Sequence, residues 1–268
     1  MQWPDRVWII GCGNMGGAIL QAWLDQGLPA NRVTVIDPRP SHLPAGVVAR
    51  ADAPDGMIPD LLLLAVKPQM FDAVTSMLAG TVGARTDLVS IMAGIEASDL
   101  RSAFPDAGSI IRLMPNMAVS IGKSPMIFFS NDADAALRSR MTGLFQSLGS
   151  PEWLDDEQQM HIATALSGSG PAFVFRFIDS LARSATRLGM DEAQAARMAL
   201  SMVEGAALLA VQSDDPTGLL ADRVASPGGG TREGLKVLDA DGRLDALLYD
   251  VLEAATDRYR ILAAEAKS

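Results

Sequence analysis

In the first half of the chain, short runs of apolar residues alternate with longer stretches in which apolar residues recur at helical spacing. Short apolar runs predict strands over 7–10, 33–36, 61–66, 87–91, 109–114, 124–130 and 152–154. The run over 61–66 is apolar throughout, as in a parallel strand that is buried on both faces. Helical spacing of apolar residues lies between the runs, over 13–26, 74–79, 95–104 (with Ser98 as its expected cap) and 134–148. The alternation predicts a doubly wound α/β domain.

Beyond about residue 155 the strand pattern stops and only helical patterns follow. These cover 158–166, 172–188, 191–212, 216–225, 231–238 and 243–267. We therefore predict two domains, an α/β domain over 1–156 and an all-helical domain over 157–268. The stretch 198–211 is apolar on nearly all sides, which indicates burial against another copy of the chain.

A glycine-rich turn separates the first predicted strand from the first predicted helix. It reads Gly11-Cys12-Gly13-Asn14-Met15-Gly16, a Gly-x-Gly-x-x-Gly pattern between a strand and a helix. In dinucleotide-binding folds the first glycine allows the tight turn, the second admits the pyrophosphate, and the third lets helix and strand pack closely. The pyrophosphate then sits at the helix N-terminus. The pattern favours dinucleotide binding over a purely structural turn.

Two further strand ends carry candidate ligand groups. Asp37 follows the second strand, 21 residues after Gly16. An acidic residue there reads the ribose 2′-hydroxyl of NAD, whereas a nearby arginine such as Arg39 reads the 2′-phosphate of NADP. The sequence offers both and leaves NADH or NADPH open, and Asp37 also fits a plain turn. Lys67 follows the buried run over 61–66, where it either steadies a cofactor phosphate or is a solvated turn residue.

Composition removes several classes of function. The chain has 268 residues, a net charge of −10, one cysteine (Cys12) and two histidines (His42 and His161). An acidic chain is a poor partner for nucleic acid. A single cysteine allows no disulfide within the chain, and no metal-ligand spacing is visible, so we expect no metal. We expect neither histidine to be catalytic, and we find no signal peptide or membrane-length apolar run, so we expect a cytoplasmic protein without a membrane partner.

A second glycine-rich loop, Ser226-Pro227-Gly228-Gly229-Gly230-Thr231, precedes a predicted helix that Thr231 caps. Successive glycine N–H groups at a helix start form an anion-binding nest, here with a hydroxyl beside it. This is the natural place for a carboxylate substrate in an acidic protein, although an ordinary turn between helices fits the same residues. Ser167 and Ser169 lie between glycines without the strand–turn–helix context of a hydrolase nucleophile.

Taken together, these motifs resemble those of pyrroline-5-carboxylate reductases. The resemblance runs from about residue 7 to 260, and its most specific parts are Ser167–Phe173 and Ser226–Thr231. The other matching segments are Ile10–Gly16, Ala65-Val66-Lys67-Pro68-Gln69, Ser90–Ile95 with Ala93 and Gly94, and Arg112-Leu113-Met114-Pro115-Asn116.

The resemblance implies a Rossmann-type domain, NADPH or NADH as cofactor, and a homodimer through the helical domain, assembled in some members into a decamer of five dimers. It implies that Ser226, Gly228, Gly229 and Gly230 bind the carboxylate of a cyclic imine, and that Thr231 orients its ring nitrogen. Cofactor contacts are implied for Gly11, Gly13, Asn14, Met15, Gly16, Asp37, Arg39, Ala65, Val66, Lys67, Pro68, Ala93, Gly94 and Asn116. In such a dimer, we hypothesise that the substrate loop completing one cofactor site comes from the other chain.

The chain departs from the family pattern in the helical domain. Gly230 stands where a threonine is common, Ser201-Met202 where a Gln-Thr pair is usual, and Asp215 where a histidine is usual. These differences leave open a related cyclic-imine reductase or a non-catalytic cofactor-binding protein. A β-hydroxyacid dehydrogenase has a similar layout, but it requires a lysine on the interdomain helix, and residues 158–188 contain none.

Overall fold

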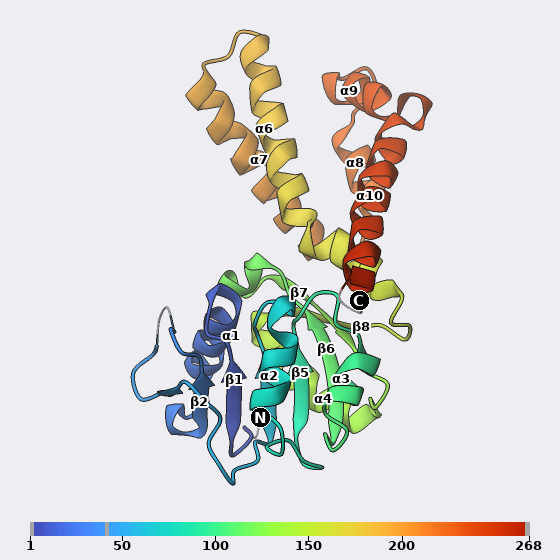
Figure 1. Cartoon of the computed structure of the whole chain (residues 1–268). Coiled ribbons are helices and arrows are strands. Elements are labelled where there is room, and N and C mark those ends of the chain that lie inside the picture. The colour runs from blue at the N-terminus through green and yellow to red at the C-terminus, as the bar shows by residue number, and fades with distance from the viewer. Residues whose placement is uncertain (1–2, 41–42, 266–268) are drawn as a thin grey trace. The chain divides into compact units, whose positions relative to one another are not determined.

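The computed structural model describes residues 3–40 and 43–265 (Figure 1). The chain divides into two compact units, one formed by Met1–Gly168 with Ala255–Ser268 and the other by Ser169–Ala254. These units differ from the two predicted domains, 1–156 and 157–268, and the domain boundary at 156/157 stays a prediction. His42 lies outside the described residues.

One eight-stranded sheet forms the centre of the first unit. Its strands stand in the order β3-β2-β1-β4-β5-β6-β7-β8. The first six are parallel, β7 is antiparallel to β6, and β8 is parallel to β7. The bounds are β1 (Val7–Ile10), β2 (Val33–Ile36), β3 (Val48–Arg50), β4 (Leu61–Leu64), β5 (Asp87–Ser90), β6 (Ser109–Met114), β7 (Ser124–Phe129) and β8 (Gly149–Trp153). The order 3-2-1-4-5-6 is that of dinucleotide-binding sheets.

Alternate residues of each strand face opposite sides of the sheet. Both faces carry buried apolar side chains, and helices cover both. One apolar core joins the sheet to α1 (Asn14–Asp25), η3 (Met117–Ile121), α4 (Ala135–Phe145) and η4 (Gln146–Leu148). The other joins it to α2 (Phe71–Met77), α3 (Ala97–Ala103) and α5 (Gln159–Ala163). Short 3-10 turns η1 (Ala30–Arg32) and η2 (Pro68–Met70) complete this part of the unit. The doubly wound α/β fold is confirmed.

Two local expectations were incomplete or wrong. The strand β3 was not predicted, because its apolar run Val47-Val48-Ala49 is shorter than those of the predicted strands; the three residues of β3 are all exposed. Ser98 does not cap α3. Glu96 is the N-cap, its side chain accepting from the backbone of Asp99 while the Asp99 carboxylate accepts from the Glu96 N–H at 2.9 Å. This reciprocal capping box satisfies two helix-end donors.

The second unit is helical throughout its described length, as predicted. It contains α6 (Gly170–Arg187), α7 (Glu192–Gln212), α8 (Thr217–Val224), α9 (Gly230–Asp239), η6 (Ala240–Gly242) and the start of α10 (Arg243–Glu265). The π-helical turn η5 (Thr164–Gly168) precedes α6. The helices α6 and α7 form an antiparallel pair (Figure 1), and the Asp191 carboxylate caps α7 by accepting from the Gln194 N–H at 2.9 Å.

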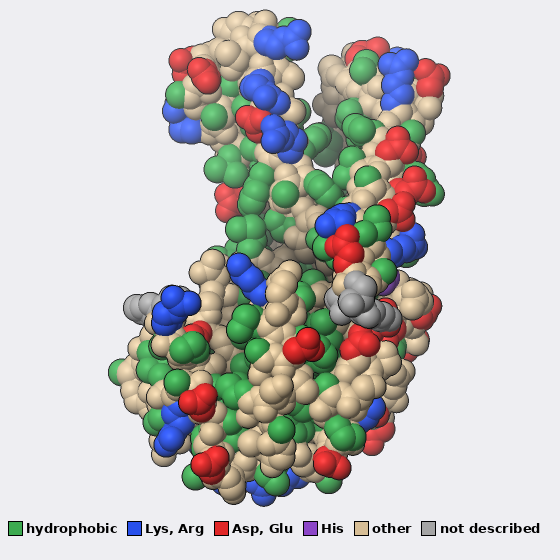
Figure 2. Space-filling model, viewed as in Figure 1, with side chains coloured by type: hydrophobic (Ala, Val, Ile, Leu, Met, Phe, Trp, Pro, Cys, Tyr) green, Lys and Arg blue, Asp and Glu red, His purple; other side chains and the backbone are tan. Residues whose placement is uncertain are grey.

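Much of the surface of this second unit is apolar. Figure 2 shows hydrophobic side chains along its helices, and on α7 the side chains of Leu209 and Val211 are 69% and 81% exposed. Among the described residues, α7 is the one helix whose length and composition would suffice to cross a membrane. A single such helix is weak evidence of a span, and α7 also carries Arg197 and Glu204 along its length.

Candidate active site

The carboxyl ends of the parallel strands bring most of the predicted cofactor residues to one edge of the sheet. Gly11 follows β1 in the left-handed region (φ +90°) and donates its N–H to Ile36 at 3.0 Å. The N–H of Ala65, after β4, donates to Ile10 at 2.8 Å. Ligands of open α/β sheets bind outside such an edge, so the edge is where a dinucleotide site belongs.

The three glycines of the first loop have different surroundings. A β-carbon on Gly11 would lie 2.6 Å from Val66 Cγ1, and one on Gly16 would lie 2.2 Å from the Gly11 carbonyl oxygen. Packing therefore requires glycine at both positions. A β-carbon on Gly13 would meet nothing within 4 Å, and its φ is −79°. Neither packing nor backbone conformation explains Gly13, whereas the approach of a ligand does.

The start of α1 fits an anionic group. Gly13 is the N-cap and makes no side-chain capping bond, and the first turn holds no acidic residue. Asn14 is exposed there, while Met15 packs against the core. The first N–H groups of a helix lack intrahelical partners and lie at the positive end of its dipole. The loop and this helix start therefore fit the pyrophosphate of a dinucleotide.

Asp37 is tied to the glycine loop. One carboxylate oxygen accepts from the Cys12 N–H and the other from the Arg39 N–H, both at 2.8 Å. Burial, and then the nearby Asp37 carboxylate, raise the pKa of the Cys12 thiol, so this side chain stays neutral beside the loop. The carboxylate thus fixes the loop and the turn that follows β2, while the Arg39 side chain is exposed.

The segments that follow β4 and β5 offer the candidate site mainly backbone groups, with Lys67 as a charged side chain. After β4, Lys67 is exposed, Val66 and Pro68 are half-buried, and Lys67 N-caps η2 without a side-chain bond. After β5 come Ala93 and Gly94. Gly94 is in the left-handed region (φ +82°), and a β-carbon there would lie 3.5 Å from the Ala263 Cα of α10. The end of α10 therefore supports this loop within the first unit.

Asn116, which follows β6, is engaged on every side. Its carboxamide donates to the Ser167 carbonyl and accepts from the Ala118 N–H, both at 2.8 Å, and its own N–H donates to Ser124 Oγ at 2.8 Å. It is buried, at 7% exposed. Asn116 therefore fixes the π-helical turn η5 and the start of η3, a structural task in addition to any cofactor contact.

A buried charged cluster was not found by sequence reasoning. Arg112, 4% exposed, pairs with Glu157 at 2.8 Å, and the same Glu157 oxygen accepts from the Ala97 N–H at 2.7 Å. Burial, followed by the charge of Arg112, lowers the pKa of His161. The cluster joins β6, the start of α3 and α5. The one available signal was Arg112, a charged residue inside an otherwise apolar strand pattern.

In the second unit, the loop Ser226–Gly229 is a tight turn. The Gly229 N–H donates to the Ser226 carbonyl at 3.1 Å, Pro227 is the second residue, and Gly228 has φ +72°. This is a type II turn, which requires glycine at its third position. The amide of Gly229 is thus used inside the loop.

Thr231 does not cap the helix that follows this turn. α9 begins at Gly230 with Gly229 as its N-cap, so Thr231 lies in the first helical turn, where its side chain is exposed. In the described part of the chain the N–H groups of Gly230 and Thr231 have no backbone partner. These two donors remain for a ligand.

Arg232 holds this loop in place and was not singled out from the sequence. Its guanidinium donates to the Asp222 carboxylate at 2.7 Å and to the Ala225 carbonyl at 2.9 Å, which joins the end of α8 to the start of α9. Asp215 pairs with Arg223 and so ties the turn before α8 to the last turn of that helix. The Ser226–Thr231 loop is therefore framed by ion pairs within its own unit.

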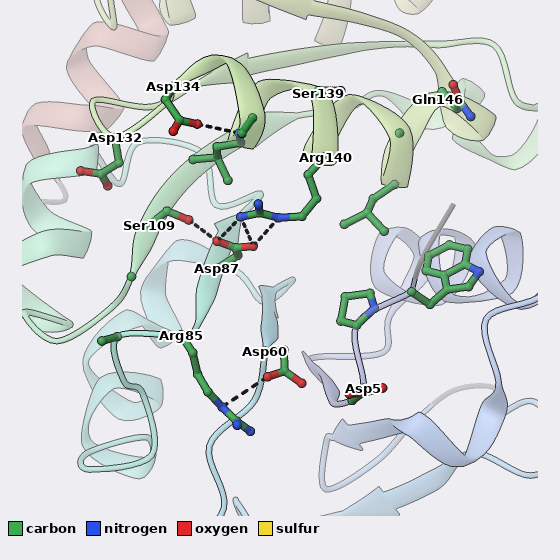
Figure 3. Close-up of a pocket in the computed structure, with 18 residues that line it drawn as sticks. Asp5, Asp60, Arg85, Asp87, Ser109, Asp132, Asp134, Ser139, Arg140 and Gln146 are labelled. Carbon is green, nitrogen blue, oxygen red and sulfur yellow. Dashed lines mark hydrogen bonds and ion pairs between the residues drawn. The ribbon is translucent and has the colours of Figure 1, made fainter.

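A pocket at the amino-terminal edge of the strands has a different character (Figure 3). Asp87 receives the guanidinium of Arg140 at 2.7 Å and the hydroxyl of Ser109 at 2.6 Å, and Asp60 pairs with Arg85 at 3.3 Å. These carboxylates are already neutralised by protein groups, and the pocket lies at the sheet edge opposite the glycine loop. It holds none of the predicted site residues.

Comparison with known proteins agrees with the geometry. Residues 6–94 match the family described as NADP oxidoreductase, coenzyme F420-dependent, and residues 157–262 match pyrroline-5-carboxylate reductase dimerisation. The first match covers the glycine loop and the second covers the Ser226–Thr231 loop. The fold and site thus define an oxidoreductase with a dinucleotide-binding domain and a helical dimerisation domain.

Whole-length relatives are more specific. Pyrroline-5-carboxylate reductases from Pasteurella multocida and Escherichia coli are each 33% identical, over 93% and 94% of this chain and 94% of each relative. The structure of a pyrroline-5-carboxylate reductase from Coxiella burnetii is 28% identical with a TM-score of 0.85, covering 96% of this chain and 98% of that one. This chain belongs to the pyrroline-5-carboxylate reductase family.

Proposed function

We propose that this protein reduces 1-pyrroline-5-carboxylate to L-proline with NAD(P)H, the last step of proline biosynthesis. Family membership over nearly the whole chain supports the activity. The proposal rests on one observation, the presence of two glycine-rich loops suited to anions. We assign Gly11–Gly16 to the cofactor and Ser226–Thr231 to the substrate carboxylate. The alternatives weighed from the sequence, a β-hydroxyacid dehydrogenase and a non-catalytic protein, are not favoured.

The chain's own groups act by binding and orientation. The N–H groups at the start of α1 hold the pyrophosphate, and those of Gly230 and Thr231 hold the substrate carboxylate. When held there, NAD(P)H would supply a hydride to C5 of the imine, whose ring nitrogen takes its proton from solvent. The Thr231 hydroxyl orients that nitrogen. Positioning accounts for most of the expected rate gain, since the cofactor carries the difficult chemistry.

The protein acts as a homodimer in this proposal. The exposed apolar side chains of α7 need a cover, and residues 157–262 match a dimerisation family, which supports pairing through the helical unit. Assembly of five such dimers into a decamer and a cytoplasmic location are further parts of the proposal. The single cysteine accords with a reducing compartment such as the cytoplasm.

The activity is tested by following NADPH and NADH oxidation with 1-pyrroline-5-carboxylate and identifying proline as the product. Absence of turnover with both cofactors, in a folded dimeric preparation, contradicts the proposal.

Thr231 is tested by Thr231→Ala beside Thr231→Ser. Loss of one hydrogen bond to a charged group is worth about 1.5–3 kcal/mol. We therefore expect the alanine variant to lose about tenfold to hundredfold in kcat/KM, while serine retains most of the activity. Equal values for alanine and wild type would remove Thr231 from the mechanism.

A further inference from the structure

The Ser226–Thr231 loop holds little shape through its own residues. Three of its six residues are glycines in succession, and glycine has more accessible backbone conformations than any other residue. A β-carbon on Gly230 would meet nothing within 4 Å, so the surrounding side chains do not confine this position. The loop's own backbone bond, from the Gly229 N–H to the Ser226 carbonyl at 3.1 Å, ends before Gly230. Contacts from outside the loop are therefore needed to hold its last two residues.

The side chain of Arg232 closes this loop at its base. From the first turn of α9 its guanidinium reaches back to the end of α8. It donates to the Asp222 carboxylate at 2.7 Å, to the Asp222 carbonyl at 3.4 Å and to the Ala225 carbonyl at 2.9 Å. The last carbonyl groups of a helix lack intrahelical partners, and a basic side chain can satisfy them. Arg232 therefore caps α8 and ties together the two helices that flank the loop.

The first turn of α9 is an unfavourable place for a cation, since a helix N-terminus carries partial positive charge. The bonds across the loop, one of them to a carboxylate, explain why Arg232 is stable there. Lys236 lies in the last turn of the same helix, where the dipole favours a cation, and pairs with Glu233 at 2.7 Å. The Arg232 side chain is 34% exposed and that of Lys236 is 63% exposed. Lys236 thus stabilises α9, whereas Arg232 stabilises the junction of α8 and α9.

We propose that Arg232 is a positioning residue for the reaction, because its bridge to Asp222 and Ala225 holds the N–H groups of Gly230 and Thr231 in the geometry that binds the substrate carboxylate. The inference rests on the proposed function and adds a residue that acts through the loop. Donors that are already ordered bind more tightly, since no ordering cost remains to be met on binding. Loss of the bridge should therefore weaken binding of the substrate and leave binding of the cofactor unchanged.

Steady-state kinetics separates this role from a general structural one. Arg232→Met removes the donors and keeps an aliphatic side chain, while Arg232→Lys keeps the charge without the planar fork. We expect Arg232→Met to raise the KM for 1-pyrroline-5-carboxylate about three- to tenfold, Arg232→Lys to raise it by a smaller factor, and the KM for NAD(P)H to stay unchanged in both. Lys236→Met removes a charge from the same helix and, as the matched control, should keep wild-type values.

Three kinetic results would overturn the proposal. The first is a wild-type imine KM in Arg232→Met. The second is an equal rise in the KM for imine and for cofactor, which would indicate general damage to the fold. The third is a fully active Arg232→Lys beside an impaired Arg232→Met, because charge alone would then account for the effect.

Hydrogen exchange tests the bridge in the full-length enzyme without substrate or turnover. The N–H groups of Gly229, Arg232 and Glu233 are all bonded within this turn and the start of α9. We expect peptides that cover residues 226–233 to exchange faster in Arg232→Met than in wild type, and at the wild-type rate in Lys236→Met. Unchanged exchange in Arg232→Met would show that the loop keeps its shape without the bridge, which contradicts the proposal.

Calorimetry with L-proline, the product of the proposed reaction, separates this proposal from the activity. The measurement needs no hydride transfer, and we expect Arg232→Met to bind L-proline about three- to tenfold more weakly than wild type and Lys236→Met to bind it equally well. Equal affinity of Arg232→Met and wild type overturns the positioning role even if the enzyme is active. A wild type that binds L-proline, loses affinity on Arg232→Met and reduces no imine overturns the proposed activity alone.

Discussion

Gly13 and Gly16 stand three positions apart in one loop, yet an added methyl group has opposite consequences at the two positions. At Gly16 the new β-carbon would lie 2.2 Å from the Gly11 carbonyl oxygen, and at Gly13 it would meet nothing within 4 Å. We expect Gly16→Ala to cost about 1–3 kcal/mol in unfolding free energy. Gly13→Ala should cost about 1 kcal/mol or less and raise the KM for the cofactor at least as much as Gly16→Ala does. Denaturant unfolding and cofactor kinetics of both variants measure this contrast. A Gly13→Ala enzyme with wild-type cofactor KM would mean that no ligand approaches there.

His161 makes the stability of the folded chain depend on pH. Its folded-state pKa is lowered from 6.5, first by burial and then by Arg112. Above the unfolded-state value both states are neutral and the folded state keeps its full stability. As pH falls below about 6.5, the unfolded state takes up a proton that the folded state resists, so stability declines. The effect ends once pH falls below the lowered pKa.

Replacing His161 with glutamine should therefore flatten this dependence. We expect the loss of Tm between about pH 7.5 and pH 5.5 to be smaller in His161→Gln than in wild type, whatever the variant's absolute Tm. Thermal scans at several pH values provide the test. Parallel curves for the two proteins would show that His161 does not titrate in this range.

At the scale of elements, the end of α10 acts as a support for the loop after β5. Ala263 is 4% exposed and its Cα lies 3.5 Å from where a β-carbon on Gly94 would be. Ala264, the next residue, is exposed. We expect Ala263→Leu to cost about 1–3 kcal/mol by overpacking and to raise the KM for the cofactor, because the displaced helix end no longer holds Ala93 and Gly94.

The matched change Ala264→Leu points to solvent and should leave both quantities near wild type. Chemical denaturation and cofactor titration of the two variants compare them directly. If Ala263→Leu destabilised the protein but left cofactor binding unchanged, α10 would support the fold and not the loop.

Elements with a strong apolar period were predictable, and those fixed by distant contacts were not. The runs that became β1 and β4 were recognisable by unbroken apolar sequence, since both faces of a parallel sheet are buried. The edge strand β3 has only three residues, all of them exposed, and it was not predicted. The helix α10 is likewise divided between the two units, and Thr256 and Ala263, in its second part, are buried. The helical spacing of apolar residues did not predict this division.

In the candidate site, too, the features fixed by local sequence were predictable and those fixed by distant contacts were not. The glycine loops were visible because glycine is required by local geometry at Gly11 and Gly228 (φ +90° and +72°). The bonds that hold those loops were not predictable, although Asp37 itself was a candidate, because Asp37 and Arg232 act on backbone groups that only the fold brings near. The sequence motifs therefore predict the binding loops, and the structure shows which bonds hold those loops in place.

At the scale of the whole molecule, the question is which chains contribute to one active site. The proposed cofactor loop, Gly11–Gly16, and the proposed substrate loop, Ser226–Thr231, belong to different compact units of the chain. In a homodimer paired through the helical unit, we hypothesise that the substrate loop completing one cofactor site comes from the partner. Gly13→Glu and Gly230→Glu are suitable probes, since a β-carbon at either position meets nothing within 4 Å.

The glutamate at position 13 repels the pyrophosphate, and the glutamate at position 230 repels the substrate carboxylate. Each variant alone is therefore expected to be inactive. After the two are unfolded together and refolded at equal concentration, half of the dimers carry one chain of each kind. If sites are shared between chains, each mixed dimer has one doubly altered site and one wild-type site, so activity returns to about one quarter of the wild-type value. If each chain builds its own site, both sites of the mixed dimer carry one glutamate, and the mixture stays inactive.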